Sequence, residues 1–375
     1  MPDASSRRAW LARCVGAGSL WMIAQPSYAK LEPSALQPRT LVFPRDFGAH
    51  PQTRLEWWYI TGAVSRPDGQ RFGFQITFFR SRTELALRQP PHPSSLAARQ
   101  ILFAHAALSD VQAQRLVHAE RMVRWNGENS PQAPQQAALQ DTDVRIGPWQ
   151  LRREGSADRS SYHAQWHDDA AGFGMNLTLA STQAVLLQGQ QGFSRKGPAP
   201  DNASFYYSQP HLRVQGTLQQ GSRTHAVSGT AWLDHEWSES LLSPEAVGWD
   251  WMGIHLRDGG ALTVFQVRGS TPWAGGSLRS PSGATRSFEP HEVRMQPLRL
   301  WKSPRTSAHY PVEWAVHTPV GRYTLRALFD AQELDSRAST GTVYWEGLSV
   351  LLDEQGQDRG EGYLEMTGYA APLKL

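Results

Sequence analysis

Short segments in which apolar and polar side chains alternate run through most of this 375-residue sequence. In RFGFQITFFR (71–80), every second side chain from Phe72 to Phe78 is large and apolar. This period of two places one face of a β-strand in a core and leaves the other face more polar. A Pro-Asp-Gly turn at 66–69 joins the segment to EWWYITGAV (56–64), and we expect a β-hairpin there.

The same combination of alternating segments and Gly-containing turns recurs later in the chain. Pairs of such segments flank the turns QQGSR (219–223), PVG (319–321) and DEQGQDR (353–359). We find no helical period longer than about three turns. Many short strands with such turns are typical of β-sandwiches and barrels, whereas parallel βαβ folds need intervening helices. We therefore predict an all-β protein.

The amino terminus has the pattern of an export signal. Arg7 and Arg8 precede the apolar run VGAGSLWMIA. Ser27 and Ala29 then occupy the small positions of a cleavage site. The paired arginines fit twin-arginine export, and an ordinary secretory signal fits equally well. Either route predicts a periplasmic or secreted protein.

Cysteine content and charge exclude several kinds of site. The only cysteine, Cys14, lies in the predicted leader, so the mature chain has no disulfide and no thiolate metal site. No later apolar run is long enough for a transmembrane helix. Removing the leader lowers the formal net charge from +3 to about +1, and no Lys/Arg run indicates nucleic-acid binding.

Aromatic and ionisable residues crowd the stretch GTAWLDHEWSESLLSPEAVGWDWMGIHL. Within it, Asp250 stands between Trp249 and Trp251, and a carboxyl group among indoles resists ionisation because burial disfavours its charged form. Such a group can act as a general acid. Indole faces can stabilise the cation that forms when a carbon–carbon double bond is protonated. His235 could orient the acid or a water molecule, and Trp237 would share its face of a strand.

These residues also have other interpretations, which the sequence leaves open. In a strand, Asp250 points away from the flanking tryptophans, toward solvent or toward an arginine such as Arg268. His235 is either a hydrogen-bonded core histidine or, with His211 and His255, part of a metal site; we favour the former and predict no metal. The chain lacks the G-x-S-x-G pattern of serine hydrolases and the Gly-rich loop of phosphate-binding proteins.

Six motifs occur in order along the chain. They are HPQTRLEWWYITG, FGFQITFFRSR, GTAWLDHEWSE, GWDWMGIHLRDG, YPVEW, and YWEG followed by GEGYLEMTGY. Together they resemble the carotenoid 1,2-hydratase/AttH-like family from about residue 44 to residue 369. The resemblance implies two lipocalin-like β-barrel domains, which we place at 40–222 and 223–375, after a signal peptide at 1–29. Small barrels of this kind can hold one ligand.

The resemblance also implies site residues. Hydratases of this family add water to a terminal double bond of acyclic carotenoids without a redox cofactor, so we expect no cofactor. Carried over to this sequence, the acid is Asp250. His235, Trp237 and Trp249 accompany it, with Trp249 at a position where we expect Tyr in the hydratases. The aromatic motifs add the predicted ligand-binding residues Trp57, Trp58, Tyr59, Trp251 and Trp345.

Two classes of function remain open. The first is an exported protein that binds an apolar, isoprenoid or lipid-like ligand and is linked to an ABC-type transport system, as some exported members of the family are. The second is a cofactor-free hydratase or hydrolase of the carotenoid 1,2-hydratase type. A carrier needs only a pocket, whereas the enzyme also needs an acid in contact with its ligand.

Overall fold

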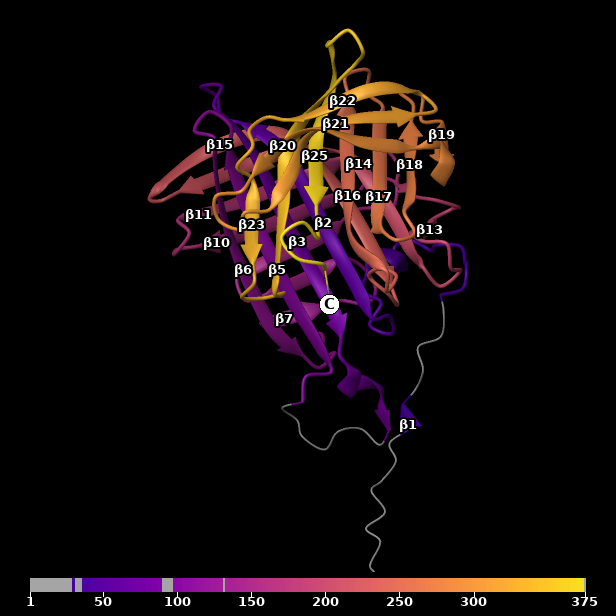
Figure 1. Cartoon of the computed structure of the whole chain (residues 1–375). Helices are drawn as coiled ribbons and strands as arrows, with labels where there is room; N and C mark the ends of the chain where they lie inside the picture. The colour runs from indigo at the N-terminus through magenta and orange to yellow at the C-terminus, as the bar shows by residue number, and fades with distance from the viewer. Residues whose placement is uncertain (1–28, 31–35, 90–96, 131, 374–375) are drawn as a thin grey trace, which may run out of the picture.

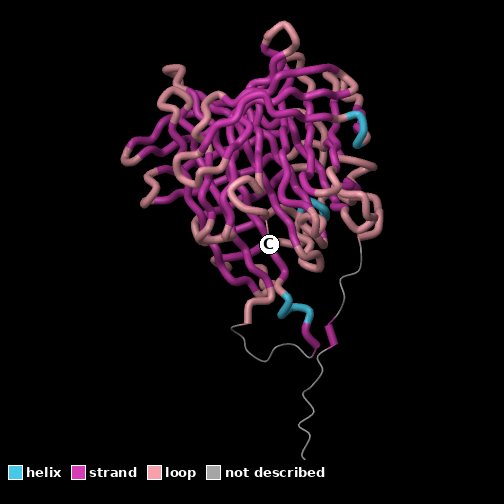
Figure 2. The backbone as a smooth tube through the Cα atoms, in the orientation of Figure 1, coloured by secondary structure: helices cyan, strands magenta, loops and turns pink. Residues whose placement is uncertain are grey.

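The structure is a computed structural model that describes residues 29–30, 36–89, 97–130 and 132–373. Figure 2 shows that nearly all of this backbone is strand, which confirms the predicted all-β class. The helices within these ranges are the 3₁₀ turns η1 (Arg45–Phe47), η2 (Glu84–Leu87) and η3 (Pro290–Glu292). None of them is long and apolar enough to cross a membrane. Except for Ala29, the predicted signal peptide lies outside the described residues.

The first sheet has 13 strands that follow the order β6-β5-β3-β2-β15-β14-β11-β10-β9-β8-β7, with β12 and β13 paired to β14. Its strands are β2 (Leu55–Ser65), β3 (Arg71–Arg82), β5 (Gln100–Asp110), β6 (Arg115–Trp125), β7 (Gln135–Ala137), β8 (Asp143–Ile146), β9 (Trp149–Glu154), β10 (Ser161–Asp168), β11 (Phe173–Ser181), β12 (Leu186–Leu187), β13 (Phe193–Arg195), β14 (Ala203–Gln220) and β15 (Arg223–Ser238). The end strand β6 also contacts β7 and β8 at the other end, so the sheet nearly closes into a barrel.

The second sheet has 10 strands in the order β19-β18-β17-β16-β25-β24-β22-β21-β20, with β23 paired to β24. Its strands are β16 (Ala246–Leu256), β17 (Ala261–Gly269), β18 (Trp273–Arg279), β19 (Thr285–Phe288), β20 (Arg294–Lys302), β21 (His309–Thr318), β22 (Gly321–Ala327), β23 (Glu333–Ser336), β24 (Thr342–Leu352) and β25 (Asp358–Met366). A separate two-stranded ladder joins β1 (Ala29–Lys30) to β4 (Arg88–Gln89).

The chain passes from one sheet to the other later than the predicted boundary at 222/223. That boundary falls in the turn of the β14–β15 hairpin, whose strands pair from Ser204–Ser238 to Gln220–Arg223. On its other edge β15 pairs with β2, so it completes the first sheet. The crossover to the second sheet is therefore the segment between Ser238 and Ala246.

Each sheet encloses its own apolar core. The first core includes the fully buried indoles of Trp58, Trp149 and Trp166, and the second includes those of Trp314 and Trp345. Burying one large apolar side chain contributes roughly 1.5–3 kcal/mol. Because the described residues contain no cysteine and therefore no disulfide, these cores carry the stability of the fold.

The two sheets also pack against each other, as Figure 1 shows for the indigo strands β2 and β3 beside the yellow strand β25. A third buried cluster lies between them and includes Tyr59 and Trp232 of the first sheet and Trp251 and Tyr363 of the second. The outward face of β2 is thus covered, and both faces of this strand are buried. This contact between the sheets encloses the site described next.

Candidate active site between the two sheets

A cavity of about 160 Å³ lies between the two sheets. Its wall is largely aromatic and contains Trp57, Tyr59, Phe79, Phe103, Tyr206, Trp249, Trp251, Phe265 and Tyr344. Five acidic residues line it as well: Glu56, Asp234, Glu236, Glu346 and Glu365. Small-molecule sites in proteins have this composition, with an apolar wall and a few placed polar groups.

Strand alternation explains why these side chains share one space. In β15, Asp234 and Glu236 point toward the cavity, whereas the residues between and after them point into the first core. In β16 the same rule sends Trp249 and Trp251 to the cavity. The crowded motif of the sequence is therefore split between a cavity wall and two cores.

Asp234 is a buried acid with three hydrogen-bond donors. The hydroxyls of Tyr206 and Ser208 and the indole N–H of Trp232 donate to its carboxyl oxygens over 2.8, 2.5 and 2.7 Å. Burial nevertheless raises the pKa of Asp234 to about 7, although these three donors lower it. Asp234 is therefore protonated in a large share of molecules near neutral pH.

Glu346 and Glu365 form an acid pair across the β24–β25 ladder. The two residues are register partners, which places their Cβ atoms about 5 Å apart. Burial and the neighbouring Glu365 raise the pKa of Glu346 well above its ordinary value. Burial also raises the pKa of Glu365 to about 8, with further increases from Asp234 and Glu236. Two like charges this close cannot both ionise readily, so the pair keeps a proton at neutral pH.

Glu346 has the properties of a proton donor to a ligand. It is 2% exposed, and the Tyr59 hydroxyl interacts with its carboxyl group, which lowers the pKa of Glu346 by less than burial raises it. Trp251 lies opposite Glu365 on the neighbouring strand, so an indole borders the pair. A protonated carboxyl group beside indoles can transfer its proton and leave a cation that the ring faces stabilise.

Asp250, which the sequence and the family resemblance indicate as the acid, does not line this cavity. Because side chains alternate along β16, the Asp250 side chain points into the second sheet. There Arg268 Nε lies 3.0 Å from Asp250 Oδ2. Gln266 Nε2 and the Tyr369 hydroxyl also donate to Asp250, over 2.8 and 2.9 Å. Burial raises the pKa of Asp250, and Arg268 lowers it. Asp250 thus belongs to a buried ion pair outside the lining of this cavity, and its role as the acid stays a prediction.

His235 and Trp237 also lie outside the cavity, in the first core. His235 Nε2 lies 2.9 Å from Glu56 Oε1, and its Nδ1 lies 2.9 Å from the Tyr207 hydroxyl. Burial lowers the pKa of His235 to about 4, so the neutral ring donates to Glu56 and accepts from Tyr207. Trp237 stacks on the ring of His50 at 3.8 Å. Both residues pack inside the barrel and are not part of the cavity lining, so their predicted catalytic roles stay predictions.

The predicted ligand-binding aromatics divide in the same way. Trp57 and Tyr59 of β2 and Trp251 of β16 line the cavity, as does Trp249 from the predicted catalytic set. Trp58 points into the first core, with its indole stacked on His235 at 4.7 Å between ring centres. The indole N–H of Trp345 donates to the backbone of Asp330 over 2.7 Å, in the second core.

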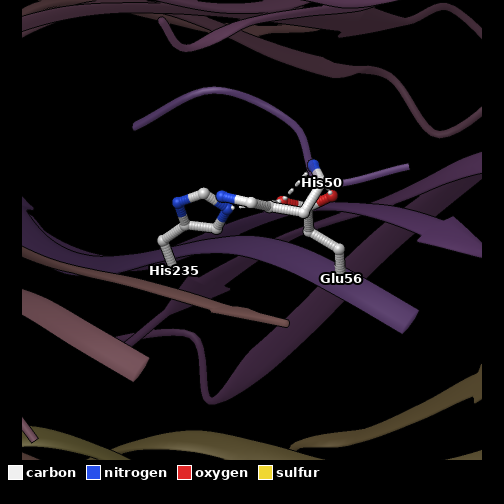
Figure 3. Close-up of side chains that lie close together, drawn as sticks. All are labelled: His50, Glu56 and His235. Carbon is white, nitrogen blue, oxygen red and sulfur yellow. Dashed lines mark hydrogen bonds and ion pairs between the residues drawn. The ribbon is translucent and has the colours of Figure 1, made fainter. Parts of the chain in front are cut away.

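His50, Glu56 and His235 form the one group in the described part of the chain with the spacing of a metal site (Figure 3). Each ring nitrogen of the two histidines already has a hydrogen-bond partner within the protein. Arg80 Nε also donates to Glu56 over 2.8 Å and brings a positive charge into the group. A cation would have to displace these bonds and approach that charge. The donor set therefore fits a hydrogen-bond network and not a metal.

Glu346 and Glu365 are the acids that sequence reasoning missed. They stand in the quoted motifs YWEG and GEGYLEMTGY, on the strand face opposite to their core residues. Alternation within these motifs would have placed both on one outward face. It could not have shown that the first sheet covers that face.

The fold and site define a class of all-β protein in which two packed sheets enclose an aromatic, acidic cavity. The AttH-like family matches residues 34–369, and the chain belongs to that family. This confirms the resemblance seen in the motifs.

Two solved structures are similar to the whole fold. The crystal structure of an AttH protein from Nitrosomonas europaea is 43% identical and covers 90% of this chain and 100% of that chain, with a TM-score of 0.81. The crystal structure of kievitone hydratase from Nectria haematococca is 12% identical, covers 88% of this chain and 94% of that chain, and has a TM-score of 0.68. No curated protein matches the sequence.

Proposed function

We propose that the cavity binds an apolar small molecule and that the Glu346–Glu365 pair adds water to a carbon–carbon double bond in it. One observation carries this proposal: a buried carboxyl group, whose pKa is raised by burial and which has the Tyr59 hydroxyl beside it, lies at a cavity lined by indoles. Such a group is a general acid suited to an apolar ligand.

The reaction balances without any other reactant. The O–H proton of the acid pair moves to one alkene carbon, whose π electrons form the new C–H bond. The other carbon becomes a cation, which the faces of Trp249 and Trp251 stabilise. A water oxygen then forms the C–O bond, and its surplus proton returns to the carboxylate. Water is consumed, and the acid is restored.

The comparisons support this proposal at the level of fold. Kievitone hydratase, a hydratase by its name, shares the two-sheet arrangement with this chain. One fold hosts many activities, so this likeness does not carry the reaction over by itself. The support specific to this chain is the acid pair in the cavity.

Isotope incorporation tests the proposal. The protein is expressed with its leader, purified, and extracted with organic solvent, and the extracted ligands are identified by mass spectrometry. Each ligand is then incubated with protein in ¹⁸O-labelled water. Wild type should form a product heavier by one labelled water, and Glu346→Gln should bind the ligand but lose turnover by about two to four powers of ten.

Asp250→Asn serves as the matched control, because Asp250 is a buried acid of β16 outside the cavity. Once circular dichroism shows that it is folded, this variant should retain turnover. If Asp250→Asn loses turnover and Glu346→Gln does not, the acid is Asp250 and the proposal is wrong.

The same experiment separates the enzyme from a carrier. In a carrier linked to an ABC-type transport system, wild type and Glu346→Gln would both retain the ligand, and neither would change its mass. Export is a further part of the proposal, because residues 1–29 have the pattern of a leader. Deleting that segment should leave the protein in the cytoplasmic fraction.

A further inference from the structure

Gln75 of β3 is a lining residue of the cavity with an unusual polar side chain. The residue is 2% exposed, and its side-chain NH₂ group donates to the Thr77 hydroxyl over 3.1 Å and to the Tyr344 hydroxyl over 3.3 Å. Its carbonyl oxygen, Oε1, is buried, and no group in the described ranges donates to it. A buried acceptor without a donor costs about 1–3 kcal/mol, so such an atom calls for an explanation.

A chain of hydrogen bonds starting at Glu120 determines which way the Gln75 amide points. The carboxylate of Glu120 only accepts, so the single hydroxyl proton of Ser339 goes to it. Ser339 Oγ must then accept from Nε2 of His105, which lies 2.9 Å away. Burial lowers the pKa of His105 to about 3, so the ring is neutral and Nδ1 is an acceptor.

The chain continues from His105 to Gln75. Nδ1 of His105 lies 3.0 Å from the Tyr344 hydroxyl and 3.5 Å from the Ser336 hydroxyl, and it accepts from the nearer one, Tyr344. The Tyr344 oxygen has then donated its only proton, so toward Gln75 it can only accept. The NH₂ group of Gln75 must face Tyr344, and the carbonyl oxygen is the atom left over. The amide orientation thus follows from the network and is not arbitrary.

We propose that Gln75 Oε1 accepts a hydrogen bond from a hydroxyl group of the bound ligand. The ligand class is then an apolar molecule that carries a hydroxyl, and not a pure hydrocarbon. This inference rests on the proposed function, because it concerns the same cavity, and it deepens that function by naming a polar group of the substrate. A site built to pair with a hydroxyl discriminates against analogues that cannot donate.

Three probes of matched chain length test this specificity. Decanol can donate a hydrogen bond, decyl methyl ether can only accept one, and decane does neither. Binding to the full-length protein is followed by tryptophan fluorescence, since Trp57, Trp249 and Trp251 line the cavity. Wild type should bind decanol about tenfold more tightly than the ether, the effect of roughly one buried hydrogen bond.

Gln75→Met removes the acceptor and keeps a side chain of similar size. This variant should bind decanol and the ether within about twofold of each other, because no unpaired oxygen remains to discriminate them. Gln209→Met is the matched control: Gln209 is also buried with an unpartnered Oε1, but it lies outside the cavity. It should retain the preference for decanol.

The outcomes separate this inference from the proposed function. Equal affinity of wild type for decanol and the ether overturns the inference, as does an unchanged preference in Gln75→Met. Neither result affects the isotope test of Glu346. If Glu346→Gln retains turnover while the preference for decanol depends on Gln75, the catalytic proposal fails and the hydroxyl subsite stands. If none of the probes binds, the inference fails, and the apolar cavity of the proposed function fails with it.

Discussion

Glu56 is the most heavily bonded acid of the first core. It accepts from the backbone N–H and the ring of His50, from the ring of His235, and from the guanidinium of Arg80. His50 and Arg80 lower the pKa of Glu56 well below its ordinary value, against the effect of burial. Such a charge is tolerated in a core only while every partner remains in place. The network therefore holds the segment around His50, which precedes β2, against β2, β3 and β15.

Glu56→Gln should strongly destabilise the fold. It removes the negative charge beside the buried Arg80, and breaking a buried pair in this way costs about 3–5 kcal/mol. The control is Arg257→Met, because the Arg257–Asp358 pair is solvent-exposed, with side chains 55% and 45% accessible. That variant should change the free energy of unfolding by less than about 1 kcal/mol. Urea unfolding measures both, and equal effects would contradict this account of the network.

At the scale of elements, strand alternation sorts each central strand into two different environments. In β24, Trp345 points into the second core, whereas its neighbours Tyr344 and Glu346 face the cavity. The sheets approach most closely where small residues allow it. A Cβ atom on Gly73 of β3 would lie 2.5 Å from the Tyr363 hydroxyl of β25. The glycine thus permits a contact between sheets that no larger residue allows without displacement.

Gly73→Ala should weaken the contact between the sheets. The new methyl group overlaps the Tyr363 hydroxyl, and overpacking of this kind costs about 1–3 kcal/mol. Adding Tyr363→Phe removes the overlapping oxygen, so the double variant should recover most of the lost free energy of unfolding. A double-mutant cycle in urea measures the coupling. Additive effects of the two substitutions would show that the overlap is relieved elsewhere.

At the scale of the whole molecule, the contact between the sheets brings acids together in a poorly solvated space. Asp234 comes from the first sheet, and Glu346 and Glu365 come from the second. The pKa values of Asp234 and Glu365 rise to about 7 and about 8 through burial. The folded protein therefore holds protons that the unfolded chain releases near pH 4. Stability must fall as pH rises through this range.

The fall should be visible between about pH 6.5 and 8. Below that window, buried histidines make the stability rise with pH, because burial lowers their pKa values. The pKa of His105 falls to about 3, that of His235 to about 4 and that of His255 to about 3. In the unfolded chain these histidines lose their protons around pH 6.5, so they oppose the fall in the lower part of the window and contribute little slope above about pH 7.5. We expect a net loss of roughly 1 kcal/mol across the window. Thermal unfolding at fixed ionic strength measures it.

The matched variant for this prediction is Glu365→Gln, which removes one titrating acid of the cavity. It should flatten the loss of stability between pH 6.5 and 8, because an amide does not titrate there. A wild-type protein equally stable at both ends of the window would contradict the raised pKa values.

Several features follow from the sequence by itself. Alternation such as that from Phe72 to Phe78 is local and specifies strands, because a period of two needs no knowledge of distant residues. The hairpins and the all-β class follow from it, and the ordered motifs establish the family. The aromatic and acidic composition of the site was also visible, since Trp249, Trp251 and Asp234 lie in one crowded stretch.

Only the tertiary structure decided which face of each strand became the site. On β16 the indoles of Trp249 and Trp251 face the cavity, and Asp250 faces the second core. The aromatic residues around Asp250 had instead indicated Asp250 itself as the acid of the site. The acid pair comes from β24 and β25, and its setting requires the first sheet to cover their outward face. Likewise, β15 belongs to the first sheet because it pairs with β2, which lies far away in the sequence. Alternation separates the two faces of a strand, but packing between distant strands determines what each face meets.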